Sequence, residues 1–399
     1  MAVPFEANLE QAARVASGAT RSSDADAVAA WHLRALACCL DSPLSEGNRV
    51  DVLACAGEGR HALLDAIDVA VDHINIEGES WLAGRDGEPL AQRLLARSRA
   101  GVGINLMCDE VMGSSTASHI EQLRGSGVRV CQAKAVHPSW RWLHGIVQAD
   151  APRRALVVID GRIAFVGPTP PAGEGDVMCR IAGAAVGELQ WLFVERWRRR
   201  VPGPMQAGRY FPALACAGTH CIGIAPAGSH IQAATHTRAL IAALDAARDR
   251  ALLIGGQPPR RALRLALIAA CRRGVDVHLL LRAEAVRGWA IPAIGATCDS
   301  MLRSGVHVHV LRAAARNTHA SVIDGVWSSI EASASDRLEA PPAAGDRVFV
   351  LDAAFGARAE AAFWSDVAQG SSTLREPAER PGLLQRLDPH LVRRLEVSS

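Results

Sequence analysis

The chain contains the same short pattern twice: an apolar run, an Asp-Gly pair, and a second apolar run. The two copies are ALVVIDGRIAFVG at 155–167 and ASVIDGVWSSIE at 320–331. Asp-Gly between two β-type runs favours a tight hairpin turn. A strand–turn–strand unit that recurs after about half the chain predicts a duplicated domain, because solenoid repeats are only roughly 20–50 residues long.

The stretches before each hairpin also repeat, and in the same order. Each amphipathic run with apolar residues at i, i+3 and i+4 predicts a helix, and the apolar run after it predicts a strand. The matched pairs are LLDAIDVAVDHINIEG (63–78) with LIAALDAARDRALLIGG (240–256), PLAQRLLARSRAGVGINLMCD (89–109) with RALRLALIAACRRGVDVHLLL (261–281), and LRGSGVRVCQA (123–133) with LRSGVHVHVLRA (302–313).

This order predicts an α/β fold of two similar halves, each a mixed β-sheet flanked by helices. The alternation of helix and strand favours a largely parallel sheet, to which the Asp-Gly hairpins add antiparallel strands. We predict halves at 46–204 and 205–370, a helical N-terminal lead-in at 1–45, and a short helical tail at 371–399. A functional site is expected where the halves meet.

Composition sets further bounds. The formal net charge of +2 gives no strong nucleic-acid signal. Lys134 is the only lysine, which fits either a coding bias or a use of arginine to grip phosphates in forked geometry. The ten cysteines form no Cys-x-x-Cys pair, and the first residues lack the pattern of a secretory signal, so we expect a reduced, cytoplasmic protein.

The segment 210–237 contains no Asp, Glu, Lys or Arg and was tested as a membrane span. A spanning helix needs about 20 mostly apolar residues. Because Pro212, Pro226 and several glycines interrupt the segment, it is better interpreted as a linker into a buried strand, HCIGIAP.

The two hairpins, together with LQWLFVERW (189–197) and RVFVLDAAFGARAEAAFWSDV (347–367), resemble the phospholipase D superfamily, and within it bacterial cardiolipin synthases. The resemblance runs from about Asn48 to about Gln369. It implies halves related by a pseudo-twofold axis and phosphatidyl transfer on phosphatidylglycerol. It also implies no metal or organic cofactor, anionic phospholipid as the partner, and peripheral contact with the inner face of the cytoplasmic membrane. An active paralogue is a further possible partner.

Members of that family carry His-x-Lys, four residues, Asp, six residues, and then a Gly-rich Asn segment, once in each half. One His attacks phosphorus, and the His of the other half protonates the leaving alcohol. Lys and Asn donors stabilise the charge that develops on the phosphate oxygens. Neither half is competent alone.

This chain departs from the family motif at most reactive positions. In the first half Arg153 stands at the His position and Ala155 at the Lys position, and Asn317 and His319 stand at the same positions in the second half. The Gly-rich segments are replaced as well, by Pro168, Pro170, Glu331, Ala332 and Ala334. From both motifs only Asp160, Gly167 and Asp324 remain.

The remaining residues suggest an inactive or impaired relative. Arginine stays protonated and cannot act as the nucleophile, but it can hold a phosphate with two parallel hydrogen bonds. The hairpin turns alone would account for the two Asp-Gly pairs. The candidate catalytic residues are Asp160, Asp324, His319 and Asn317, and the candidate phosphate-binding residues are Arg153, Arg154 and Arg316.

Other histidines were considered as substitutes. His137 and His144 precede the first motif and could reach the site or lie in a surface loop. His307 and His309 alternate on one strand and share a face, but without a third ligand nearby they do not predict a metal site. Three hypotheses follow: a transferase that uses His319, a non-catalytic module that binds anionic phosphate or phospholipid, and a decayed copy without a biochemical role.

Overall fold

The fold is described from a computed structural model of the chain. The residues it describes are 24–78, 82, 84–108, 114–132, 156–167, 177–201, 205, 208–226, 230–255, 259–282, 299–311, 320–331 and 346–374.

The first half begins after helix α2 (Asp24–Ala37), which lies within the predicted helical lead-in at 1–45. Its elements, in chain order, are β1 (Ser45–Ala54), η1 (Cys55–Gly59), α3 (Arg60–Asp68), β2 (His73–Glu77), α4 (Gly84–Arg99), β3 (Gly103–Cys108), α5 (Ser114–Gly125), β4 (Arg129–Gln132), β5 (Leu156–Ile159), β6 (Ile163–Val166), β7 (Val177–Ala182) and α7 (Ala185–Arg200).

The second half repeats this order. Its elements are β8 (His220–Ala225), α8 (His230–Ala246), β9 (Arg250–Gly255), α9 (Arg261–Arg272), β10 (Asp276–Arg282), β11 (His307–Leu311), β12 (Ala320–Ile323), β13 (Trp327–Glu331), β14 (Arg347–Leu351), α12 (Ala353–Gly370) and β15 (Ser371–Leu374).

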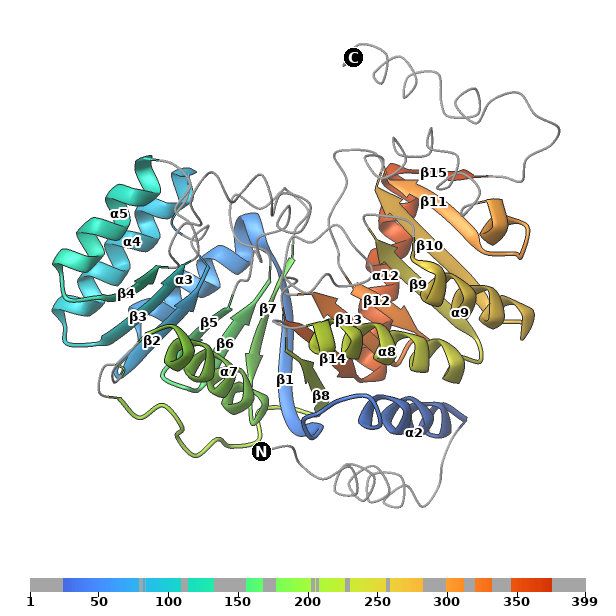
Figure 1. Cartoon of the computed structure of the whole chain (residues 1–399), viewed down its shortest axis with the longest axis horizontal. Helices are drawn as coiled ribbons and strands as arrows, with labels where there is room; N and C mark the ends of the chain where they lie inside the picture. Colours follow the sequence, from blue (N-terminus) through green and yellow to red (C-terminus); the bar gives the residue numbers. More distant parts are fainter. Residues whose placement is uncertain are drawn as a thin grey trace, which may run out of the picture.

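All of these strands join one 15-stranded sheet (Figure 1). Its order, β15-β11-β10-β9-β12-β13-β14-β8-β1-β7-β6-β5-β2-β3-β4, is the same when read outward from the centre in either direction, apart from the extra edge strand β15. The two halves meet where β1 pairs with β8 in antiparallel orientation. The predicted pair of similar halves related by a pseudo-twofold axis is therefore confirmed. The division of the chain at residue 204 stays a prediction, although it falls between α7 and β8.

The prediction of a largely parallel sheet is wrong. Among the described strands, the pairings β2–β3, β3–β4, β9–β10 and β10–β11 are parallel, and the other ten are antiparallel. Parallel neighbours need a crossover such as a helix, and in the first half α4 joins β2 to β3 and α5 joins β3 to β4. The two strands of each Asp-Gly hairpin are joined by a tight turn and pair antiparallel, and the central strands β7, β1, β8 and β14 also pair antiparallel.

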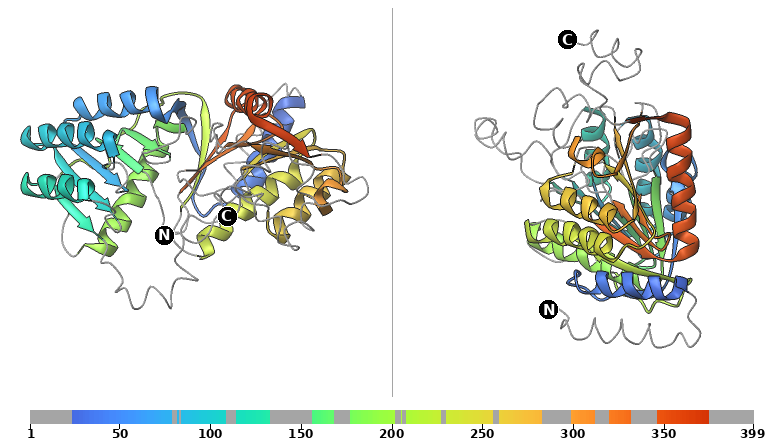
Figure 2. Two further views of the ribbon diagram at one scale, coloured as in Figure 1. Left: turned by 90° about the horizontal axis from the view of Figure 1, so that it is seen from above. Right: turned by 90° about the vertical axis from the view of Figure 1, so that its right-hand side faces the viewer.

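Helices cover both faces of the sheet. On β5, Val157 and Ile159 pack into the core beneath α3, α4 and α5, whereas Leu156 and Val158 pack into the core beneath α7. This alternation follows from the period of two in a strand. In the second half, α8 and α9 lie on one face and α12 on the other (Figure 2).

The core beneath α7 continues across the junction of the halves. It includes Val50 of β1, Ile222 of β8, Val348 of β14 and Phe355 of α12, all buried. The halves therefore share one apolar core as well as one sheet.

The two Asp-Gly turns have the same structure. Asp160 and Asp324 have φ angles of 53° and 51°, and Gly161 and Gly325 have φ angles of 61° and 62°. A left-handed conformation at both central positions is that of a type I′ hairpin turn, which Asp followed by Gly tolerates well. The predicted hairpins at 155–167 and 320–331 are confirmed.

Each Asp side chain also binds the chain that enters the neighbouring strand. The Asp160 carboxylate accepts hydrogen bonds from the backbone N–H groups of 71, 72 and 73, at 3.0, 2.8 and 2.9 Å. The Asp324 carboxylate accepts the equivalent bonds from 248, 249 and 250, the closest to each being 3.0, 2.9 and 3.0 Å. In the second half, buried His32 of α2 adds a bond of 2.9 Å to Asp324. Both residues are therefore structural clamps.

The prediction of a short helical tail at 371–399 is wrong for its first residues. Residues 371–374 form β15, which pairs antiparallel with β11 at the sheet edge. An extended β11 edge offers unpaired backbone groups, and a strand satisfies them. Residues 375–399 lie outside the described part of the chain.

Replacing Asp324 by Ala is expected to lower the free energy of unfolding by about 3 kcal/mol, because three backbone N–H groups and His32 lose a charged acceptor. Burial acts to raise the pKa of Asp324, but the bonds from His32 and the backbone outweigh it and lower that pKa. The stabilisation is therefore present above the unfolded pKa of about 3.9 and is lost as the pH falls through the lower folded pKa.

Urea unfolding of both proteins across the acid range measures this difference. Asp245→Ala, at an exposed position of α8, is the matched control and should change the free energy of unfolding by less than about 0.5 kcal/mol. A loss in Asp324→Ala no larger than in the control would contradict the clamp.

Candidate functional site

The family resemblance predicts reactive positions just before β5 and β12. Most of the predicted site residues fall in that part of the chain and lie outside the described residues: Arg153, Arg154, Arg316, Asn317 and His319, together with His137 and His144. The structure describes the strand ends that these segments lead into, which are the beginnings of β5 and β12.

The two motif Asp residues are at the other end of their strands. Asp160 is four residues beyond Leu156, which is roughly 13 Å along an extended strand. Its carboxylate, like that of Asp324, binds backbone N–H groups at the turn. The geometry thus gives both residues a role in the scaffold. Gly167, the third motif residue that remains, is buried just after β6.

A buried ionic bridge joins the two halves near the beginning of β5. Glu77 ends β2 and lies opposite Leu156, the first described residue of β5. Arg196 of α7 donates to Glu77 at 2.8 Å and to Asp346, next to β14 of the second half, at 2.8 Å. A second guanidinium nitrogen of Arg196 also binds Asp346. All three residues are at most 8% exposed.

Charge balance explains why these groups can be buried. Burial alone would lower the pKa of Arg196, but Asp346 and Glu77 raise it well above its ordinary value, so the guanidinium stays protonated. The two carboxylates already occupy this guanidinium and would repel an anionic ligand. Arg196 is therefore a connector between the halves and not a phosphate-binding residue.

Glu188 lies two turns before Arg196 on α7 and is a carboxyl with a strongly raised pKa. Burial, with a smaller contribution from Asp346, raises its pKa to about 7, against an opposing hydrogen bond with Ser42. A carboxyl that gains or loses a proton near neutral pH suits acid–base work. It lies on the same helix as the ionic bridge.

Two histidines of the segment 210–237 occupy structural positions. His220 begins β8 and accepts a 2.9 Å hydrogen bond from the backbone N–H of Val50, which joins β8 to β1. His236 of α8 is buried and stacks on Phe349 with ring centroids 6.0 Å apart. Burial and the charge of Arg347 hold the pKa of His236 well below its usual value, so its ring is neutral. The predicted linker into a buried strand is confirmed.

The ionic bridge is not among the sites that the sequence predicts. One signal was available: Arg196 lies seven residues after Leu189 on the apolar face of LQWLFVERW, and a charge on a buried face needs a partner. The partners, Glu77 and Asp346, carry no such signal, because they are 269 positions apart and meet only in the folded chain.

A polar group also lies inside the first half, around the single tyrosine of the chain. Asn105 of β3 donates to Asn75 at 2.8 Å and to the Tyr210 hydroxyl at 3.1 Å. His73 packs against the Tyr210 ring with centroids 4.4 Å apart. The segment between α7 and β8 thus closes this part of the sheet.

At the equivalent place in the second half, four titratable side chains gather. His307 and His309 share a face of β11 as predicted, but the expectation that they have no third ligand nearby is wrong. The parallel register of β10 and β11 places His278 opposite His307, and Asp276 lies two residues earlier on the same face. Burial, followed by the neighbouring histidines, lowers the pKa of His309 to about 4.

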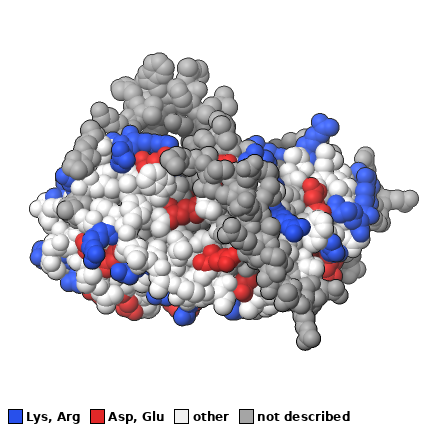
Figure 3. Space-filling view, turned by 90° about the horizontal axis from the view of Figure 1, so that it is seen from below, with Lys and Arg blue, Asp and Glu red and all other residues white. Residues whose placement is uncertain are grey.

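Surface charge is mixed on the face seen in Figure 3. Arginines and acidic residues are interspersed there among uncharged side chains and do not form one basic stripe. Among the described residues, no helix is both long and apolar enough to span a bilayer.

Replacing Arg196 by Ala is expected to lower the free energy of unfolding by about 3–5 kcal/mol, because two buried carboxylates lose their counter-charge.

Denaturant unfolding of the parent protein and of Arg196→Ala measures this loss. Arg199→Ala on the same helix is the control, since Arg199 makes an exposed pair with Glu195 that contributes less than about 0.5 kcal/mol. Equal effects of the two substitutions would show that the buried bridge does not hold the halves together.

Comparison with curated proteins finds cardiolipin synthases. The chain is 25% identical over 310 residues to cardiolipin synthase A of Cronobacter sakazakii, which covers 71% of this chain and 62% of that protein. The identity to cardiolipin synthase A of Escherichia coli O157:H7 is also 25%, over 311 residues. The chain thus spans about 62% of the length of these relatives. No family model matches the chain.

Solved structures share the fold. Phosphatidylserine synthase of Haemophilus influenzae Rd KW20 aligns with a TM-score of 0.59 and 10% identity, over 87% of this chain and 92% of that one. Polyphosphate kinase of Porphyromonas gingivalis aligns with a TM-score of 0.50 and 13% identity, over 88% of this chain and 55% of that one. By its two-half fold and its distant homology to cardiolipin synthases, the chain belongs to the phospholipase D superfamily.

Proposed function

We propose that this protein binds anionic phospholipid headgroups between its halves and has lost most or all phosphatidyl-transfer activity. The observation that carries the proposal is the contrast between scaffold and motif. The hairpins, their Asp clamps and the junction of the halves are intact, while the nucleophile and lysine positions are substituted.

The substitutions remove the groups that the family's chemistry needs. Arg153 and Asn317 stand where the two motif histidines are expected, and neither side chain can form a phosphohistidine-type intermediate. Asp160 and Asp324 do not restore activity by themselves, since their carboxylates serve the turns. Their presence is explained by the fold alone.

The substrate class comes from the relatives. Cardiolipin synthases and a phosphatidylserine synthase are, by name, enzymes of phospholipid synthesis. Arg153, Arg154 and Arg316 supply forked donors near the former motif positions, and such donors suit a phosphodiester better than a point charge does. A headgroup phosphate is therefore the proposed ligand.

A turnover assay separates this proposal from a transferase that works through His319. Purified protein is incubated with phosphatidylglycerol vesicles, and mass spectrometry measures cardiolipin, phosphatidic acid and glycerol. We expect no product above background, because a nucleophile displaced by about 1 Å costs about a hundredfold in rate. An active cardiolipin synthase is the positive control. Product that disappears in His319→Ala would overturn the loss of activity.

Vesicle binding tests the binding half of the proposal. We expect saturable binding to vesicles that contain phosphatidylglycerol, weakened by salt and weak on neutral phosphatidylcholine. The double substitution Arg153→Gln/Arg154→Gln should weaken binding roughly 10- to 30-fold, because each arginine near an anionic surface contributes about 1 kcal/mol.

The control for this experiment removes the same charge elsewhere. Arg272→Gln/Arg303→Gln changes two exposed arginines, one at the end of α9 and one before β11, and should leave binding within about twofold. Equal losses of affinity in both double variants would show that binding depends only on net charge. Absence of binding by the folded parent protein would reject the proposed function.

A further inference from the structure

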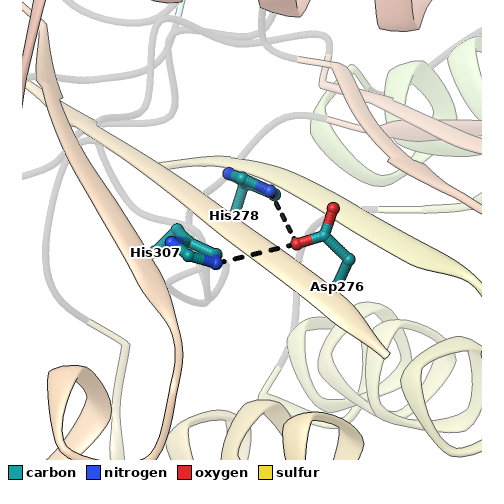
Figure 4. A group of neighbouring side chains, drawn as sticks. All are labelled: Asp276, His278 and His307. Carbon is teal, nitrogen blue, oxygen red and sulfur yellow. Dashed lines mark hydrogen bonds and ion pairs between the residues drawn. The ribbon is translucent and has the colours of Figure 1, made fainter. Parts of the chain in front are cut away.

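The cluster on β10 and β11 has the composition and spacing of a metal site. Asp276 and His278 come from β10 and His307 from β11 (Figure 4). The Asp276 Oδ1 atom lies 2.8 Å from Nε2 of His278 and 3.8 Å from Nε2 of His307. One ligand atom from each of the three residues lies within 4.8 Å of the other two.

These separations suit one small ion. Zn²⁺ binds imidazole nitrogen at about 2.0–2.1 Å and carboxylate oxygen at about 2.0–2.2 Å, so neighbouring ligands of a tetrahedral site are roughly 3.4 Å apart. Small side-chain rotations would bring the three atoms to that spacing. The backbone is fixed, because the residues stand two apart on one strand and directly opposite on its parallel neighbour.

A buried neighbour orients the central ligand. His309 is 5% exposed, and its Nε2 lies 3.0 Å from Nδ1 of His278. Trp364 of α12 packs edge-on against the His278 ring at 4.8 Å between centroids. Metal-binding histidines usually hydrogen-bond through the ring nitrogen that does not face the ion, which fixes the ring and its tautomer. His278 has this arrangement.

The second oxygen of Asp276 is also engaged. Arg250 of β9 approaches Oδ2 at 3.3 Å and leaves Oδ1 toward the two histidines. Asp276 and His307 have side chains that are 43% and 55% exposed. Water can therefore reach the site and complete the coordination.

The fold itself does not require these residues. At the equivalent positions of the first half, β3 and β4 carry Gly103, Asn105 and Arg129, with Cys131 in place of His309. There Asn105 bonds to Tyr210 and Asn75. The duplicated scaffold thus tolerates other side chains at this place, and the cluster belongs to the second half alone among the described residues.

We propose that Asp276, His278 and His307 bind a divalent transition-metal ion, Zn²⁺ or a close neighbour, with His309 positioning His278. Two imidazoles and one carboxylate favour such ions over Mg²⁺ or Ca²⁺, which prefer oxygen ligands. Asp276 begins β10 and pairs with Arg250, which begins β9 next to the Asp324 turn. The ion therefore lies at the opposite end of the strands from the predicted motif positions. The site stands apart from the proposed phospholipid-binding function, and its ion would tie β10 to β11 beneath α12.

Metal binding is measured on the full chain without an affinity tag, after chelation, reconstitution with Zn²⁺ and buffer exchange to remove the unbound ion. We expect about one equivalent of tightly bound Zn²⁺ by elemental analysis and by competition with a fluorescent chelator, and no competition by Mg²⁺. Co²⁺ should give an intense visible spectrum, since low-symmetry coordination by nitrogen and oxygen is expected.

His307→Ala should weaken Zn²⁺ binding more than about 100-fold, beyond the 10- to 100-fold that changes around a metal site cost. The exposed His307 should be replaceable without loss of the fold, which the thermal unfolding midpoint of the metal-free protein checks. His307→Cys should retain binding, because a thiolate replaces the imidazole.

His61→Ala is the matched control, because His61 is an exposed histidine on α3, outside the cluster. Added Zn²⁺ should raise the unfolding midpoint of the parent protein and of His61→Ala, and not that of His307→Ala. Absence of a stoichiometric ion in the parent protein, or Zn²⁺ binding in His307→Ala equal to that of His61→Ala, would overturn the proposal.

Discussion

The arrangement of the two halves depends on one buried arginine. Arg196 lies between Glu77 of the first half and Asp346 of the second, near the beginning of β5. Around it, β1 pairs with β8, and a single apolar core passes beneath both. A bridge of this kind can be buried only when charge and geometry match on both sides. It therefore helps to fix how the halves face each other.

The two halves have kept a common framework and diverged in what fills it. Asp160 and Asp324 clamp equivalent strands with equivalent backbone bonds, but only the second clamp also receives a bond from α2, through His32. The polar interior next to these clamps differs more. The first half closes around Tyr210, whereas the second gathers Asp276 and three histidines. The side chains that bind the backbone are the same in both halves, whereas side chains without such bonds differ.

Most of the fold follows from local patterns in the sequence. Alternation, amphipathic periods and the two Asp-Gly turns predicted the order of helices and strands and the two-half plan, because each signal acts over a few residues. Two errors had physical causes. The alternation of helix and strand suggested a parallel sheet, but the hairpin strands are joined by tight turns and the central strands pair antiparallel with strands from distant parts of the chain. The start of the tail joins the open edge of β11 as β15, a pairing with a distant segment that no local pattern reports.

The sequence by itself determined the elements, their duplication, and the turns at Asp160 and Asp324. These are properties of neighbouring residues. Only the tertiary structure decided that Arg196 would join Glu77 to Asp346, and that His307 would meet His278 and Asp276. Such contacts depend on strand order and register, which are set by packing across the whole sheet and bring together residues far apart in the chain.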